Sequence, residues 1–343
     1  MTNTIPEQLP SDAPPARALL AMIFGAVQTQ LLSVAAQIRI PDLLKDSPKS
    51  VKALAEATGT QEPALSRLLR ALTDLGIVVE TAPGQFICTP MGALLQADSP
   101  NSLREYAMLF GRSLAFDTWA NLLHSVHTGM SAFEDRFGMN IYAYLQHHSD
   151  DAAAFYDAMT SVSNQESRAI CEVYDFCACR TVVDVGGGQG FLLATLLQAY
   201  PSLHGILLDL PQVVDSAHTV LQDKISEGRC QIVGGDLLTA IPPGGDVYII
   251  KRVLIDRDDA QARTLLTNCR NVMKPHGRVL VADPDITSLY GTLFDISMLT
   301  VFGSGSRIRT PAELHDLFAT AGLKLTRTLS TPSALLLVEG VPV

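Results

Sequence analysis

The sequence predicts an α/β protein in which a Rossmann-like, doubly wound sheet follows an N-terminal all-helical and winged-helix region. From residue 180 onward, short apolar runs such as TVVDV, GILLDL and DVYII alternate with helical segments, the pattern of βαβ units around a parallel sheet. Before that point apolar residues recur at helical spacing, and the main exception is a pair of alternating runs on either side of APG. The 343 residues suffice for about two domains.

The N-terminal region, residues 17–100, is expected to be a dimerisation domain. Apolar side chains in residues 17–46 occupy more than one face of the expected helix, as in a helix that a partner covers. A helix that Ser50 caps, a second helix from Glu62 to Gly76 and the hairpin around APG together indicate a winged helix. Such modules can bind DNA, but the second helix is acidic as well as basic and the net charge is −10, so we expect no nucleic-acid partner.

Composition adds expectations about location. No apolar run reaches the roughly 18–20 residues that a membrane span needs, so we expect no membrane partner. Residues 1–16 lack the basic and apolar segments of a signal peptide, and their proline, serine and acidic content indicates a disordered lead-in. The six cysteines lack the spacing of a zinc site, which predicts reduced thiols, no bound metal and a cytoplasmic protein.

Residues 101–178 are expected to form a helical linker that lines the substrate pocket. Aromatic and methionine side chains, among them Phe155 and Met159, recur along this segment. Such a stripe is often plain core. Because the segment joins two domains, and ligand pockets favour domain interfaces, both interpretations stay open.

The segment TVVDVGGGQGFLLATLLQAYP, residues 181–201, contains a strand, a glycine turn and a helix in succession. Glycine suits a turn that needs positive φ or close approach to a ligand, and a helix N-terminus attracts anions. Asp209 ends the second strand, where an acid binds ribose hydroxyls, and Asp236 follows the third strand. Asp184, just before the glycines, would repel a pyrophosphate and attract an ammonium group. The motif therefore favours S-adenosylmethionine over NAD.

The motifs VVDVGGGQG, ILLDLPQVV, GGDLL and YIIKRVL resemble those of the S-adenosylmethionine-dependent small-molecule O-methyltransferases. That family includes caffeate, hydroxyindole, and bacterial anthracycline and phenazine methyltransferases, and the resemblance runs from about residue 17 to the C-terminus. It implies a homodimer formed through the N-terminal domain and a cofactor-binding domain over residues 179–343. The glycine loop would hold the amino acid part of the cofactor. The motifs and the resemblance together assign cofactor binding to Asp184, Gly186, Gly188, Asp209, Leu210, Asp236, Leu237, Lys251 and Ser163.

The stretch KRVLIDRDD, residues 251–259, departs from the family pattern. Most plant-type members have a histidine where this sequence has Ile255, and that histidine is the general base that takes the proton of the acceptor hydroxyl. Bacterial members that act on phenazines and anthracyclines also lack it. Two acidic residues usually orient the histidine. Asp283 occupies one of their positions, and Ile308 replaces the other.

The ionisable residues that remain in this stretch are poor candidates for a general base. Asp256 is a weak catalytic candidate, because the family has a structural aspartate there. Asp258 is expected to be a helix N-cap. Arg252 and Arg257 are expected to pair with these aspartates, or Arg257 could face an anionic acceptor.

Three hypotheses about the reaction remain, in order of preference. General-base catalysis contributes roughly 10²–10⁴-fold, so an acceptor that needs no base, a ring nitrogen or an already ionised acidic phenol, comes first. In the second, an ordinary hydroxyl gives its proton to Asp256, to water or to a pocket histidine such as His124 or His127. In the third, the bound cofactor acts as a fixed positive charge in a cyclisation, rearrangement or hydroxylation. A ligand-sensing regulator is a further alternative.

The expected acceptor pocket is apolar and aromatic, which favours a planar, largely hydrophobic aromatic acceptor. The Gly/Ser-rich segment VFGSGSRIRT, residues 301–310, is expected to act as a gate. The candidate lining residues are Phe110, Phe116, Trp119, Phe155, Met159, Ile255, Met298 and Phe302.

Overall fold

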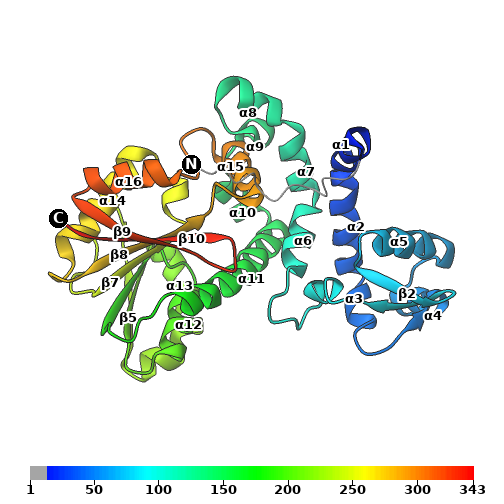
Figure 1. Cartoon of the computed structure of the whole chain (residues 1–343), viewed down its shortest axis with the longest axis horizontal. Helices are drawn as coiled ribbons and strands as arrows, with labels where there is room; N and C mark the ends of the chain where they lie inside the picture. The colour runs from blue at the N-terminus through cyan, green and yellow to red at the C-terminus, as the bar shows by residue number, and fades with distance from the viewer. Residues whose placement is uncertain (1–13) are drawn as a thin grey trace. The chain divides into compact units, whose positions relative to one another are not determined.

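The computed structural model describes residues 14–343, which divide into two compact units (Figure 1). The N-terminal unit comprises residues 14–120 and 142–162, and the sheet unit comprises residues 121–141 and 163–343. The expected lead-in over residues 1–16 lies almost wholly outside the described residues. Within them no single helix is long and apolar enough to span a membrane, and one pair of consecutive helices, bent by 49°, meets that length and composition only together.

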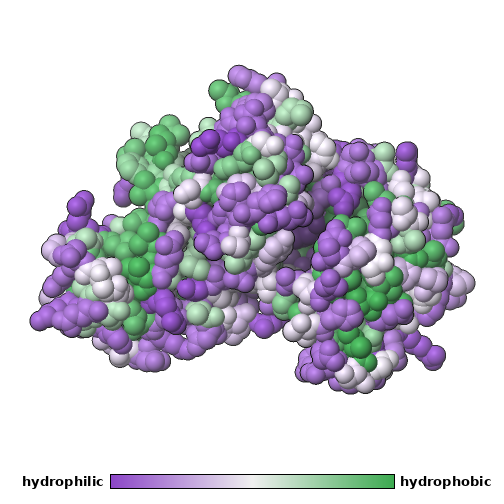
Figure 2. Space-filling model, turned by 180° about the vertical axis from the view of Figure 1, so that it is seen from behind, coloured by the Kyte–Doolittle hydropathy of each residue, from purple (hydrophilic) through white to green (hydrophobic). Residues whose placement is uncertain are grey.

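The apolar segment 17–46 forms three helices rather than one, which corrects the sequence expectation. They are α1 (Pro15–Ile23), α2 (Gly25–Gln37) and α3 (Ile40–Leu43). Phe24 separates the first two, and Arg39 takes a left-handed conformation, φ 58°, before the third. Hydrophobic surface lies over α1 (Figure 2, upper left). The exposed apolar side chains of α1 and the start of α2, here called the α1 surface, are Leu19, Leu20, Met22, Ile23, Phe24 and Val27.

The expected winged helix is present. The Ser50 hydroxyl accepts the Ala53 N–H at 3.1 Å and starts α4, and Gly59, at φ 67°, ends that helix. Strands β2 and β3 form the hairpin, and a two-residue strand, β1, pairs antiparallel with β3 to give the order β1-β3-β2. A strand that short leaves no alternating pattern, so the sequence did not predict it. The elements are β1 (Lys49–Ser50), α4 (Val51–Thr58), α5 (Glu62–Asp74), β2 (Val78–Ala82) and β3 (Gln85–Cys88).

Helices make up most of the remaining chain as far as the large sheet. In the N-terminal unit they are η1 (Gly92–Leu95), α6 (Arg104–Phe110), α7 (Ser113–Ala120) and all but the first residue of α10 (Ile141–His147). In the sheet unit they are α8 (Leu122–Thr128) and α9 (Ala132–Phe137). The 25-residue helix α11 (Ser149–Val173) belongs to the N-terminal unit up to Val162 and to the sheet unit from Ser163.

The large sheet has seven strands in the order β6-β5-β4-β7-β8-β10-β9. The strands from β4 to β8 are parallel, whereas β10 runs antiparallel to both of its neighbours, β8 and β9. The strands are β4 (Thr181–Val185), β5 (His204–Asp209), β6 (Cys230–Gly234), β7 (Val247–Lys251), β8 (Arg278–Pro284), β9 (Leu323–Ser330) and β10 (Leu335–Pro342). The associated helices are α12 (Phe191–Ala199), α13 (Pro211–Ser226), η2 (Leu254–Asp256), α14 (Asp259–Val272), α15 (Leu289–Phe302) and α16 (Pro311–Thr320).

Helices cover both faces of this sheet (Figure 1). Residues of α11, α12 and α13 form the core on one face, and residues of α14 and α16 form the core on the other. Successive residues of β7 alternate between these cores, which explains its unbroken apolar sequence. The strand order reverses between β4 and β7, and the carboxyl ends of strands at such a reversal are where ligands bind in this kind of fold.

Candidate active site

The glycine loop follows β4 and needs glycine for two reasons. Gly186, Gly188 and Gly190 have φ values of 75°, 57° and 83°, a region that glycine adopts readily. A Cβ atom on Gly186 would also lie 2.6 Å from Cγ2 of Val253, and one on Gly187 would lie 2.6 Å from the carboxyl carbon of Asp184. The loop is therefore packed closely against the strand ends beneath it.

The β4–β5 pairing brings Asp209 to this loop, as the sequence predicts. The Gly188 N–H donates to Oδ2 of Asp209 at 2.8 Å, and the Leu210 N–H donates to Oδ1 at 2.7 Å. Two backbone donors thus fix the carboxylate while each oxygen retains a second lone pair. Those lone pairs can accept hydrogen bonds from neighbouring hydroxyl groups, as on a ribose.

Asp184 lies buried beneath the loop with 1% of its surface exposed. Its Oδ2 atom finds no hydrogen-bond partner among residues 14–343. Burial raises the pKa of this carboxyl to about 7, although the Lys251 ammonium opposes the rise. A buried carboxyl with an unsatisfied oxygen suits a cationic ligand group, since pairing would offset the desolvation cost.

The two residues assigned to the third strand end lie near the same loop. Asp236 is exposed, and its Oδ1 accepts the Leu238 N–H at 2.9 Å. Leu237 is buried, and its Cδ2 lies 3.6 Å from where a Cβ on Gly186 would stand. Leu237 therefore contributes an apolar wall beside the glycine turn.

Glu166, on α11, is a charged residue at this site that the sequence did not reveal. It is 2% exposed, and its Oε2 accepts from Nζ of Lys251 at 3.3 Å. The same ammonium donates to the hydroxyl of Ser163 at 2.7 Å, so the helix holds this lysine at two points one turn apart. Burial alone would raise the pKa of Glu166, but the charges of Arg252 and Lys251 hold it below its ordinary value.

Arg252 corrects a prediction, because its ion-pair partner is Glu166 and not a neighbouring aspartate. Its Nε donates to Oε1 of Glu166 at 2.7 Å, and Nη2 donates to the hydroxyl of Tyr290 at 3.2 Å. Its guanidinium also lies 4.7 Å from the ring centre of Phe294. The backbone of Arg252 is left-handed, with φ 56°. The prediction had assumed that this arginine pairs with the aspartates closest to it in sequence. Arg257 donates to the backbone oxygen of Asp256, at 3.2 Å.

Ile255, in the 254–257 turn, and Ile308 belong to one buried cluster. Ile255 and Ile308 are 3% and 4% exposed, and both pack with Met298. Phe302 packs against the same group. The expected pocket residues of the sheet unit thus lie together. The other five candidates, Phe110, Phe116, Trp119, Phe155 and Met159, belong to the N-terminal unit.

Two carboxyl groups lie near this apolar cluster. Burial raises the pKa of Asp256 to about 6, against the opposing charges of Arg257 and Arg252. Burial also raises the pKa of Asp283 to about 7, and its Oδ1 has no hydrogen-bond partner in the described part of the chain. Asp258 accepts the Gln261 N–H at 2.8 Å and caps α14, as predicted.

The expected gate, residues 301–310, is hydrogen-bonded to other parts of the sheet unit. The Ser304 N–H donates to the Gly129 oxygen at 2.8 Å, and the Arg307 N–H donates to the Ile255 oxygen at 2.9 Å. The Ile308 N–H donates to Oδ1 of Asp295 at 2.6 Å. These contacts fix the segment's two ends to different parts of the sheet unit.

Comparison with known families supplies the identity of this arrangement. An O-methyltransferase dimerisation domain matches residues 20–98, and an O-methyltransferase domain matches residues 119–324. The chain belongs to the O-methyltransferase family. This methyltransferase is 39% identical over 329 residues to phenazine O-methyltransferase PhzM of Lysobacter antibioticus, covering 95% of this chain and 96% of that protein. It is 31% identical over 321 residues to phenazine-1-carboxylate N-methyltransferase of Pseudomonas aeruginosa, covering 92% and 94%.

The fold and the cofactor of this methyltransferase agree with solved structures. CalO1, a methyltransferase in calicheamicin biosynthesis whose structure contains S-adenosylhomocysteine, superposes with a TM-score of 0.87 at 35% identity and covers 97% of this chain and 100% of that chain. The cofactor is S-adenosylmethionine. The residues present fit it, because the unpartnered Oδ2 of buried Asp184 suits the ammonium of its amino acid part. The glycine loop and the fixed carboxylate of Asp209 provide room and acceptors for the rest.

Proposed function

We propose that this enzyme methylates a nitrogen or an acidic, already ionised oxygen of a planar aromatic small molecule, without a general base at position 255. The bound cofactor supplies an activated methyl group on a sulfonium centre. The observation that carries the proposal is that Ile255, Met298 and Ile308 belong to one buried apolar cluster. The family resemblance implies a general base at position 255 and an orienting acid at position 308. Three apolar side chains in contact cannot remove a proton from an acceptor.

The chemistry remains feasible without a base because alignment contributes much of the rate. A lone pair on a ring nitrogen, or on a phenolate, can attack once it is held in line with the methyl group. A general base would add roughly 10²–10⁴-fold for a protonated hydroxyl and little for such acceptors. Relatives of this chain include both kinds of enzyme: 8-amino-8-demethylriboflavin N,N-dimethyltransferase of Streptomyces davaonensis and 3-amino-4-hydroxybenzoate 4-O-methyltransferase of Streptomyces cremeus.

A second candidate keeps an ordinary hydroxyl as the acceptor and uses a carboxyl as the proton acceptor. The observation in its favour is that Asp256 and Asp283 lie near the apolar cluster with pKa values raised to about 6 and about 7. Asp283 is buried and Asp256 is partly buried, and the positive charge of Arg252 acts on both. This candidate predicts that the turnover of a phenol rises with pH, with an apparent pKa near neutrality.

The proposal also includes the cofactor-binding roles that the sequence assigns to individual residues. Asp184 would pair with the ammonium group, the loop of Gly186 and Gly188 would enclose the amino acid part, and Asp209 would accept from the ribose hydroxyls. Leu210, Asp236 and Leu237 would border the adenine, and Lys251, held by Ser163, would close that side. The buried position of Leu237 beside Gly186 supports this arrangement.

The test is incubation with isotopically labelled S-adenosylmethionine and matched acceptors. Phenazine-1-carboxylate offers ring nitrogens, an acidic phenol offers an ionised oxygen, and a phenol of similar shape but ordinary acidity serves as the control. We expect product from the first two, with mass and regiochemistry placing the methyl group on nitrogen or on the acidic oxygen. Equal turnover of the ordinary phenol at neutral pH would contradict the proposal and favour the carboxyl mechanism.

We also propose that the enzyme is a homodimer that uses the α1 surface. The support is the dimerisation domain over residues 20–98 together with exposed apolar side chains that an isolated chain would leave in water. Light scattering after size-exclusion chromatography should give twice the chain mass, and Leu20→Lys with Ile23→Lys should give the monomer. A monomeric wild-type enzyme would refute it.

A further inference from the structure

Arg309 makes an unusual set of contacts for a buried arginine. Its side chain is 2% exposed, and it lies immediately after Ile308. Nη1 donates to the backbone oxygen of Leu254 and Nη2 donates to that of Arg257, both at 2.7 Å. Nε and Nη2 also donate to one carboxylate oxygen of Asp259, at 3.0 and 2.9 Å. The guanidinium thus bridges the two backbone oxygens that flank Ile255 and the first residue of α14.

The turn that carries Ile255 has weak internal bonds. The Asp256 N–H reaches the oxygen of Val253 at 3.3 Å and the Arg257 N–H reaches that of Leu254 at 3.2 Å, both long for backbone hydrogen bonds. Bonds from a charged guanidinium are shorter and stronger. The two 2.7 Å bonds from Arg309 are therefore shorter than the turn's own backbone bonds, and the Arg307 N–H adds a bond of 2.9 Å to the Ile255 oxygen.

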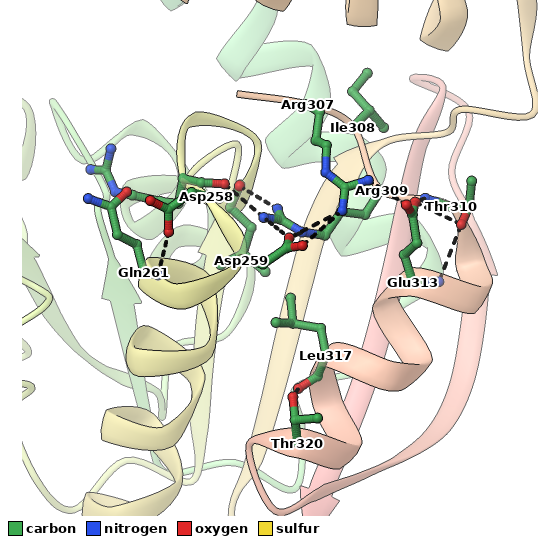
Figure 3. A network of polar contacts seen from close by, with 12 residues as sticks. Asp258, Asp259, Gln261, Arg307, Ile308, Arg309, Thr310, Glu313, Leu317 and Thr320 are labelled. Carbon is green, nitrogen blue, oxygen red and sulfur yellow. Dashed lines mark hydrogen bonds and ion pairs between the residues drawn. The ribbon is translucent and has the colours of Figure 1, made fainter. Parts of the chain in front are cut away.

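The arginine is held on a rigid base. Thr310 caps α16, and Glu313 completes a capping box with it. Figure 3 shows Arg307 and Arg309 converging on Asp259 from the segment that precedes this helix. Arg307 is more exposed, and its side chain contacts Asp259 and Glu313 rather than the turn.

Two consecutive residues, Ile308 and Arg309, therefore act on Ile255 in different ways. Ile308 belongs to the same buried cluster as Ile255, and Arg309 binds backbone oxygens on both sides of Ile255. We propose that Arg309 is a positioning residue, which sets the place of Ile255 against Ile308 and so aligns the acceptor for methyl transfer. The inference rests on the proposed function, because it takes the Ile255–Ile308 wall to be part of the acceptor site.

The test compares Arg309→Met, which keeps length but removes every donor, with Arg307→Met as the matched control. Acceptor kcat and KM are measured, and calorimetry gives the Kd of S-adenosylhomocysteine. A displacement of about 1 Å can cost about 10²-fold, so we expect Arg309→Met to lower kcat by about 10–100-fold. The cofactor-product Kd should stay within about 3-fold, and Arg307→Met should stay within about 3-fold in all measurements. Arg309→Lys should restore part of kcat, since one donor can still reach the turn.

A double-mutant cycle separates positioning from a general loss of structure. If Arg309 acts through Ile255, its loss should cost at least about 5-fold less in kcat when Ile255 is already alanine. Additive losses, or parallel losses of turnover and S-adenosylhomocysteine binding, would overturn the proposal. If Arg309→Met does not fold, Arg309→Lys and Asp259→Asn take its place in the same cycle. The cycle runs on whichever acceptor the wild type methylates, so its outcome is separate from that of the acceptor panel.

Discussion

Glu166→Gln should destabilise the sheet unit strongly, because it removes the carboxylate that forms ion pairs with two nearly buried cations. Glu166 is 2% exposed, and the side chains of Lys251 and Arg252 are 12% and 17% exposed. Breaking a buried pair by removing one partner costs about 3–5 kcal/mol. Lys251 keeps its hydrogen bond to Ser163 and Arg252 keeps the Tyr290 hydroxyl, so we expect the lower end, about 3 kcal/mol.

The expected change is large enough to measure directly. In a unit of about 200 residues, 1 kcal/mol corresponds to about 2–4 °C, so Tm should fall by about 6–12 °C. Differential scanning calorimetry and far-UV circular dichroism are the appropriate methods, because the sole tryptophan, Trp119, belongs to the other unit. The matched control is Glu172→Gln, an exposed glutamate on the same helix, which should change Tm by less than about 2 °C. A fall below about 2 °C for Glu166→Gln, or an equal fall for both variants, would refute the reasoning.

Four further predictions concern single residues. Ile255→His should raise kcat/KM on ordinary phenols by about 10-fold, less than the usual 10²–10⁴-fold because one orienting acid is missing, and an unchanged rate in the phenol panel would contradict it. Asp184→Asn should raise the Kd of S-adenosylhomocysteine by about 10–100-fold. It should not lower the Tm of the unliganded protein, because the carboxyl that it removes is buried with an unpaired oxygen. Calorimetry measures the first effect and thermal unfolding measures the second. Gly186→Ala should weaken the same binding more than Gly188→Ala, because only at Gly186 would the added Cβ meet a side chain as well as positive φ, and equal losses would argue against it. Burial alone would raise the pKa of Glu339, but hydrogen bonds lower it to about 2. The ionised carboxylate should therefore stabilise the folded protein fully above the ordinary pKa of a glutamate, and this stabilisation should decline as the pH falls towards 2. Glu339→Gln should flatten the dependence of Tm on pH between about 4.5 and 3.

The features that the sequence predicted well are those set by local chemistry. The cap at Ser50, the strand–loop–helix around Gly186 and the acid at Asp209 each depend on residues close in sequence or on a fixed strand period. Because parallel strands place their carboxyl ends at one edge, the motif positions also predicted which residues would meet. That is why the arrangement of the glycine loop and the strand ends was accessible from sequence alone.

The features that the sequence could not predict depend on contacts between distant elements. Glu166 pairs with a residue 86 positions away, and nothing in SNQESRAI distinguishes its glutamate from an exposed one. Arg252 was expected to pair with a neighbour in sequence, but the structure pairs it with the helix instead. Arg309 bonds to backbone oxygens 55 and 52 residues earlier, and backbone acceptors carry no sequence signature at all.

The place of β10 in the sheet affects how the chain is made. This strand lies between β8 and β9 and pairs with both, yet it follows both along the chain. Until β10 emerges during synthesis, the edges of β8 and β9 that it pairs with lack this partner, and open strand edges promote aggregation. The sheet closes only after residues 335–342 emerge, so a chain cut short by even this one strand would leave two open edges in the interior of its sheet.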